Sequence, residues 1–467
     1  MPLDIRKLLD GAQGRNYALH EEHVNPQFAK MLKAIGYDRC YVRAEGPYLW
    51  DEKGRKYLDM LAGYGMFNFG RNNRAIRDTL RDFLALDYPS LVQLEAPLLS
   101  GLLAQELKKR VGRGLDIVYL TNSGTEGTET AIKFAHGATR RPVILYCERA
   151  FHGLTTGALA LNGCPSFRAG FDPLPPFARE VPFDDLNALE DALKAGDVAA
   201  FIVESVQGKG IFMPSPGYLA EASRLCHRYG ALFVADEVQA GMGRTGRFLG
   251  IDYDENVEAD IVVLSKSLSG GYVPVGAVLT RREIYDAVFS TLERAVIHSS
   301  TFGQGSLAMV AGLASLKEMD ESHAIANAEA MGARLRQGIE AIAAQSPFIK
   351  EVRQRGLMIG IEFQRPASLA LRTAWDMIHR MNAGLFPQAV TIPLLDDHAV
   401  LTQVAGHHMD VIKLIPPLII GEDDVRWFLE AFEAVMRDLR RFPGPVWEIL
   451  TKLGSFAVAS RTRRKVA

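Results

Sequence analysis

The chain between residues 116 and 264 repeats one pattern, in which a short apolar run is followed by a stretch of helical character such as residues 218–229. Continuous apolar runs of this length are typical of strands buried on both faces of a parallel sheet. Strands that alternate with helices favour an α/β domain with a doubly wound, mainly parallel sheet. The five runs are residues 116–120, 143–147, 200–204, 231–235 and 260–264.

The sequence on both sides of this region has a different pattern. Residues 41–60 read as a β-meander with turn signals, and residues 325–440 mix long helices with short strands. Because a chain of 467 residues exceeds the size at which one hydrophobic core stops growing, we expect both chain ends to build a second, smaller α+β domain. The predicted divisions are 1–75 and 326–440 for the small domain, 76–325 for the large domain and 441–467 for a C-terminal tail.

The bulk composition narrows the function classes. Lysine and arginine total 53 against 55 acidic residues, so a nucleic-acid partner is not expected. The four cysteines form no CxxC pair, which argues against a disulfide framework or a zinc site, and no metal site is predicted. No run of about 18 apolar residues predicts a membrane span, and the first residues do not read as a secretory leader. The expected location is the cytoplasm.

The residues that follow each predicted strand matter most, because open α/β sheets bind ligands at the carboxyl edge of their strands. Small residues at 121–125 open a helix, whose first backbone N–H groups suit an anion; a plain helix cap is the alternative. Phe151 follows the second strand and could stack on a flat ring, although a core role is the commoner one for such a residue.

Two charged residues follow later strands. Asp236 would be a costly buried carboxylate unless it meets a cation, such as a protonated pyridine nitrogen; a helix N-cap role is the alternative. Lys266 stands among serines and glycines, and a lysine partly removed from water becomes a nucleophile able to form a Schiff base. Phosphate loop, aromatic ring, carboxylate and lysine together predict a site for pyridoxal 5′-phosphate (PLP).

Over residues 25–440 the sequence resembles the class III (ornithine/ω-type) aminotransferases of PLP fold type I. The segments that carry the resemblance are 122–126, 151–153, 235–239, 243–246, 265–266, 300–302, 352–353 and 416–417.

The resemblance implies a role for each matching residue. Lys266 would form the internal aldimine and then shuttle a proton, and Asp236 would pair with the pyridinium nitrogen. Phe151 and Val238 would cover the two faces of the ring, with Gln239 near the ring hydroxyl.

Other matches concern the phosphate and the neighbouring subunit. Gly124 and Thr125 would bind the phosphate through backbone N–H groups, and Thr301 would reach the phosphate of a neighbouring subunit, which implies a homodimer with shared sites. The resemblance also assigns three further residues to cofactor binding, namely Ser123, His152 and Glu204.

Three residues bear on the substrate. Arg353 matches the arginine that grips a substrate carboxylate, for which a guanidinium fork is suited; a surface arginine is the alternative. Lys209 stands where many ornithine-type relatives carry a glutamate, so the pocket would gain a second cation. Phe67 belongs to an aromatic loop, residues 65–71, that replaces a Gly-His loop of relatives and favours a bulky apolar substrate.

The C-terminal tail carries an apolar stripe followed by a basic end. Such a stripe can lie on a membrane surface, but it more often packs on its own dimer. The stripe consists of Val446, Ile449, Leu450 and Leu453 beside Trp447, and the basic residues are Arg461, Arg463, Arg464 and Lys465.

The sequence therefore predicts a PLP-dependent transaminase. It would move an amino group from an amino-acid donor, with glutamate expected, to an aldehyde or ketone that could be bulky or lipid-like. An aminomutase or racemase of the same family is the alternative, and it would need no second co-substrate. A non-catalytic binding protein of the same fold is a third reading, against which the intact Lys266 and Asp236 argue.

Overall fold

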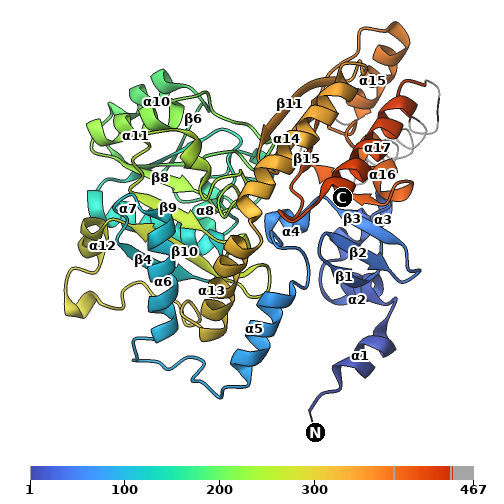
Figure 1. The fold of residues 1–467 in the computed structure, drawn as a ribbon. Helices are drawn as coiled ribbons and strands as arrows, with labels where there is room; N and C mark the ends of the chain where they lie inside the picture. Colours follow the sequence, from blue (N-terminus) through green and yellow to red (C-terminus); the bar gives the residue numbers. More distant parts are fainter. Residues whose placement is uncertain (1, 382–383, 407, 442–443, 445–446, 448–467) are drawn as a thin grey trace.

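The computed structural model describes residues 2–381, 384–406, 408–441, 444 and 447. Its centre is a seven-stranded sheet in the order β4-β10-β9-β8-β7-β5-β6 (Figure 1). Its strands are β4 (Ile117–Thr121), β5 (Val143–Cys147), β6 (Ala178–Val181), β7 (Val198–Glu204), β8 (Leu232–Asp236), β9 (Ile261–Leu264) and β10 (Gly276–Thr280).

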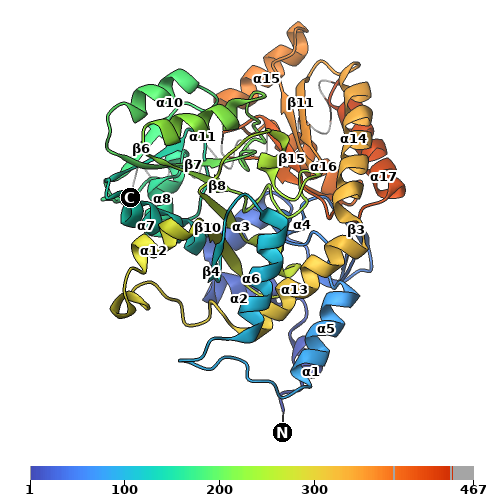
Figure 2. The ribbon, with the colours of Figure 1, turned by 60° about the vertical axis from the view of Figure 1, so that its left-hand side comes forward.

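The sheet is parallel except for β10, which pairs antiparallel with both β4 and β9. Strands β5 and β7 are buried at every position, which explains why their sequences are continuously apolar. Helices cover the sheet on both faces, as the two views of the ribbon show (Figures 1 and 2). The predicted α/β class with a doubly wound, mainly parallel sheet is confirmed.

The helices occupy the connections and the flanks. They are α1 (Ile5–Ala12), α2 (Asn16–His23), α3 (Pro26–Ala34), α4 (Ala62–Gly65), α5 (Arg74–Leu84), α6 (Leu98–Val111), α7 (Gly124–Thr139), α8 (Thr156–Ala160), α9 (Pro165–Arg168), α10 (Leu186–Leu193), α11 (Tyr218–Arg228), α12 (Arg282–Val288), α13 (Ser306–Glu321), α14 (Ala324–Ala343), α15 (Leu369–Met381), α16 (Gln388–Asp396) and α17 (Glu422–Asp438).

The two chain ends meet in the smaller sheets. The meander β1 (Tyr41–Glu45), β2 (Tyr48–Asp51) and β3 (Lys56–Asp59) is joined by β13 (Val400–Leu401), which runs parallel to β3. A second sheet has the order β11-β12-β15-β14. Its strands are β11 (Ile349–Arg355), β12 (Met358–Phe363), β14 (Gln403–Val404) and β15 (Val411–Leu414). The prediction that both ends build the smaller α+β part is therefore confirmed (Figure 1).

Of the predicted apolar tail, the structure describes Trp447. Its side chain is buried beside Phe348 and Phe386, and its indole N–H donates to the Leu439 carbonyl at 3.2 Å. The other stripe and basic residues, Val446, Ile449, Leu450, Leu453, Arg461, Arg463, Arg464 and Lys465, lie outside the described residues. In the part of the chain that is described, no helix has the length and apolar character needed to cross a membrane.

Candidate active site

Strands β4, β5, β7, β8 and β9 point the same way, so their carboxyl ends meet at one edge of the sheet. Hydrogen bonds show that the residues after these strands converge there. His152 Nδ1 lies 2.7 Å from Asp236 Oδ2, and the Phe151 backbone N–H donates to Glu204 Oε1 at 3.0 Å. The predicted gathering of Phe151, His152, Glu204 and Asp236 is therefore present in the structure.

Lys266 follows β9 with a backbone φ of +47°, which is uncommon for a residue other than glycine. Such strain is concentrated at functional sites, where the surrounding structure holds it. Burial lowers the pKa of the Lys266 amine, against the opposing charges of Asp236 and Glu204. The turn is held in place at the following residue, because Asn68 Nδ2 donates to Ser267 Oγ at 3.0 Å. Lys266 is therefore a buried amine in a fixed position, suited to nucleophilic chemistry.

Asp236 is a buried carboxylate that is held on both oxygens. Oδ1 accepts from the Val238 backbone N–H at 3.0 Å, and Oδ2 faces His152 Nδ1. Burial lowers the pKa of His152, but the hydrogen bond that its ring donates to Asp236 and the charge of that carboxylate raise the pKa above its usual value. The buried His152 Nε2 finds no partner in the described structure. Each Asp236 oxygen takes part in one of these hydrogen bonds and can accept another. The carboxylate can therefore still pair with a cation.

The start of α7 has the form expected of a phosphate site. The Ser123 side chain caps the helix by accepting from the Glu126 N–H at 3.3 Å, so for this hydroxyl the plain-cap alternative applies. The first N–H groups of a helix, here those of Gly124 and Thr125, have no intrahelical acceptors. A Cβ on Gly124 would lie 2.8 Å from Val238 Cγ1, which explains the glycine at this close approach.

The segment that carries Thr301 lies beside the same helix start. Asn122 Nδ2 donates to Ser300 Oγ at 2.6 Å. Thr301 itself is exposed, next to the exposed ring of Phe302. Thr301 is therefore open to solvent in a single chain.

Glu204 and Gln239 complete the cluster. The two oxygens of Glu204 accept from the N–H groups of Phe151 and Gly208, at 3.0 and 2.7 Å, and burial raises the pKa of this carboxyl. Gln239 Nε2 donates to the Tyr64 carbonyl at 3.0 Å, while its buried Oε1 finds no partner in the described structure. Gln239 therefore has a free acceptor, which suits a ring hydroxyl.

Arg353 does not have the environment that its predicted role requires. Its guanidinium pairs with Glu351 and Glu362 and donates to the carbonyls of Gly210 and Ile211. These contacts use four of the five guanidinium N–H groups. The one that remains cannot make the two parallel hydrogen bonds of a bidentate contact with a carboxylate. The structure therefore does not support Arg353 as the carboxylate-binding residue, and we assign it no substrate role.

Phe67 lies half-buried beside the turn that follows Lys266. A Cβ on Gly271 would lie 2.5 Å from its ring, and the Arg71 guanidinium lies 4.2 Å from the ring centroid. Phe67 therefore packs under the Lys266 turn, while Tyr64, just before this loop, is 53% exposed.

Lys413 on β15 is a functional candidate that sequence reasoning missed. It is 4% exposed, and its Nζ donates to the Gly208 carbonyl at 3.0 Å. Burial, followed by the positive charges of Lys209 and Lys266, lowers the pKa of Lys413 to about 7. The signal was present, because a lysine inside the apolar run 411–415 repeats the setting that drew attention to Lys266.

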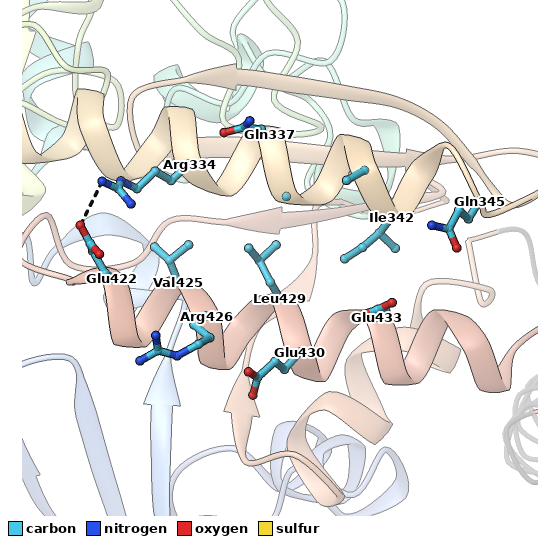
Figure 3. Close-up of a pocket in the computed structure, with 12 residues that line it drawn as sticks. Arg334, Gln337, Ile342, Gln345, Glu422, Val425, Arg426, Leu429, Glu430 and Glu433 are labelled. Carbon is cyan, nitrogen blue, oxygen red and sulfur yellow. Dashed lines mark ion pairs between the residues drawn. The ribbon is translucent and has the colours of Figure 1, made fainter.

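A surface cavity of about 560 Å³ lies elsewhere, between α14 and α17 (Figure 3). Val425, Leu429 and Ile342 line it, and Arg334 forms an ion pair with Glu422 at one end. None of the residues around Lys266 lines this cavity. It is a groove between two helices and carries no part of the site.

The arrangement at the strand edge defines a PLP-dependent enzyme of fold type I, and the chain belongs to the class III aminotransferases. The family model, described as Aminotransferase class-III, matches residues 32–436.

Three relatives illustrate the likeness. Aminotransferase PigE of Serratia sp. (strain ATCC 39006) is 33% identical over 455 residues, which cover 91% of this chain and 53% of PigE, so the chain spans about half the length of that relative. Ornithine aminotransferase from Toxoplasma gondii ME49 is 28% identical with a TM-score of 0.82, covering 94% of this chain and 99% of that one. The ω-transaminase from Pseudomonas jessenii in complex with PMP is 25% identical with a TM-score of 0.78, covering 88% and 94%.

The cofactor of this family is PLP, and the residues at the strand edge fit it. Asp236 suits the ring nitrogen, and Lys266 offers the amine that joins the aldehyde. The unpartnered Gln239 Oε1 suits the ring hydroxyl. The helix start at Gly124 suits the phosphate.

Proposed function

We propose that this aminotransferase takes the amino group of an amino-acid donor, glutamate first, and transfers it to an aldehyde or ketone. The observation that carries the proposal is the buried amine of Lys266 at the strand edge it shares with Asp236. The likeness to an aminotransferase and to transaminases supports the same reaction class.

Each residue has an assigned task. PLP supplies an electron sink that allows the C–H bond beside the amino nitrogen to break. Lys266 Nζ takes the proton from that carbon and returns it, since burial lowers the pKa of this amine and leaves more of it in the free-base form than a lysine in water would have. Asp236 would hold the proton on the ring nitrogen, with His152 orienting Asp236. Phe151 and Val238 would cover the two faces of the ring.

The acceptor is proposed to carry an apolar group. Support comes from Tyr64, the residue just before the aromatic loop, whose side chain is half exposed and whose carbonyl accepts from Gln239. The Lys413 amine lies 5.9 Å from the Tyr64 ring centroid, so this loop borders the buried lysines. An aldehyde with a long or bulky apolar chain matches such a border better than a small oxo acid does.

The active unit is proposed to be a homodimer in which Thr301 contributes to the partner's phosphate site. The support is an apolar surface formed by two segments that are tied together, because the Ser306 N–H donates to the Ser90 carbonyl at 2.9 Å. A cluster of exposed apolar side chains on a folded protein marks an interaction site. The exposed side chains are Leu84, Leu86, Val92, Leu94, Leu98, Leu292, Val296 and Phe302.

The test is a donor and acceptor assay on purified protein loaded with PLP. With glutamate and a series of aldehydes of increasing chain length, we expect amine product and 2-oxoglutarate in equal amounts, with kcat/KM rising along the series. Lys266→Ala is the matched control and should form neither. Product without any oxo acid would contradict transamination and favour the mutase or racemase alternative.

A further inference from the structure

Lys209 lies between two aromatic rings. Its Nζ is 5.0 Å from the ring centroid of Phe151 and 4.9 Å from that of Phe167. The two rings are themselves in edge contact, with centroids 5.7 Å apart and an interplanar angle of 70°. An ammonium within about 6 Å of a ring centroid is attracted to that ring, and more strongly when water is excluded. Within the described ranges Lys209 makes no ion pair. The electron-rich faces of the two rings are therefore the attractive contacts that its ammonium makes.

The backbone beside Lys209 is fixed by two buried charged groups. The Gly208 N–H donates to Glu204 Oε2 at 2.7 Å, and the Gly208 carbonyl accepts from Lys413 Nζ at 3.0 Å. The other oxygen of Glu204 accepts from the Phe151 N–H. Glu204 therefore ties together the segments that carry Lys209 and Phe151, and their relative position does not depend on the flexible lysine side chain alone.

We propose that Lys209 is a positioning residue that acts on the cofactor through Phe151: held in a clamp between Phe151 and Phe167, its ammonium keeps the Phe151 ring in place and sets a positive charge beside it. This rests on the proposed function, in which Phe151 stacks on PLP. In this role Lys209 replaces the substrate-binding role that the sequence predicted for it. The charge of Lys209 also disfavours a proton on the amine of Lys266.

The clamp belongs to a wider set of charges at the strand edge. Burial lowers the pKa of Lys266, Asp236 and Glu204 raise it, and the charge of Lys209 lowers it again. Removing that charge should therefore favour a proton on the nitrogen that joins Lys266 to the cofactor. Among the residues that the structure describes, the titratable groups around the clamp are Cys164, Glu204, Asp236, His152, Lys266 and Lys413.

The test compares Lys209→Met with wild type and with Lys209→Arg, which keeps the charge and the stacking. Apoenzyme is titrated with PLP to give a dissociation constant, and the pH midpoint of the yellow band is measured on the loaded protein. Lys209→Met should bind PLP about 3- to 30-fold more weakly, which is the range of a cation–π contact. Its midpoint should rise by about half to one pH unit. Lys209→Arg should stay within about twofold of wild type.

Phe167→Leu removes the far wall of the clamp and leaves Lys209 and Phe151 in place. Like Lys209→Met, it should weaken PLP binding. It tests the proposal if Lys209→Met does not fold. Unchanged PLP affinity and midpoint in Lys209→Met, with only the KM of the donor altered, would overturn the proposal in favour of a substrate-binding lysine. A wild type without a yellow band would instead identify failure of the proposed function itself.

Discussion

We predict that a substitution of the buried Lys413 stabilises the protein, whereas most substitutions in a protein core destabilise it. Replacing this buried lysine by methionine keeps a long unbranched side chain but removes an amine that the fold holds out of water. We expect Lys413→Met to be more stable than wild type at acidic pH, because there the fold has to bury a protonated amine that water solvates in the unfolded chain.

The magnitude follows from the pKa. A lysine whose pKa falls from 10.5 in the unfolded chain to about 7 in the fold costs about 5 kcal/mol of stability below pH 7. That cost shrinks as pH rises from about 7 to about 10.5, since the unfolded chain binds the extra proton throughout this window. The methionine leaves the Gly208 carbonyl without its donor, a loss of about 1–3 kcal/mol. The net gain is therefore about 2–4 kcal/mol at pH 6 and close to zero at pH 9.

The assay is thermal unfolding at pH 6 and pH 9 with equal cofactor loading. For a chain of this length about 1 kcal/mol corresponds to about 1 °C, so Tm should rise by about 2–4 °C at pH 6 and by about 1 °C or less at pH 9. Lys317→Met, at an exposed lysine, is the control and should change Tm by less than about 1 °C. A lower Tm at pH 6, or a gain that does not shrink with pH, would refute the reasoning.

Three further predictions concern the site and its surroundings. Asp236→Asn should fold normally but lose about 10²–10⁴-fold in kcat, measured by donor turnover, because an amide cannot hold the ring-nitrogen proton as a carboxylate does. Arg353→Met should lower stability by about 1–3 kcal/mol in chemical denaturation, since Glu362 keeps Lys350 as a partner but the Gly210 and Ile211 carbonyls lose their donor, while KM for glutamate stays within about twofold; a large rise in KM would restore the carboxylate-binding role. Leu94→Asp should shift the protein from dimer to monomer in sedimentation experiments, and a monomeric wild type would contradict the proposed dimer.

The central sheet could be predicted because strands buried on both faces leave a continuous apolar signature, as in β5 and β7. Strand β10 was not singled out. A turn region containing Lys266, with no crossover helix, joins it to β9, so the chain reverses within the sheet. The strand-end logic found Lys266 and Asp236 because parallel strands deliver their carboxyl ends to one edge.

The remaining misses depend on contacts between distant segments. Arg353 reads as available in the sequence, but the register of β11 on β12 brings it to Glu362, and no local pattern reveals that register. Lys413 could not be found by the strand-end pattern, because it lies within β15 of the smaller domain and not after a strand of the central sheet. The clamp around Lys209 needed the positions of Phe151 and Phe167, which the sequence places far from it.

The most direct test of the account is a visible absorbance spectrum of purified wild type beside Lys266→Ala, before and after glutamate is added without an acceptor. We predict a yellow band in the wild type that disappears with glutamate, and no such band in Lys266→Ala although the variant folds. A band that persists in Lys266→Ala, or a wild type that takes up no PLP, would contradict the claim that Lys266 carries the cofactor at this strand edge.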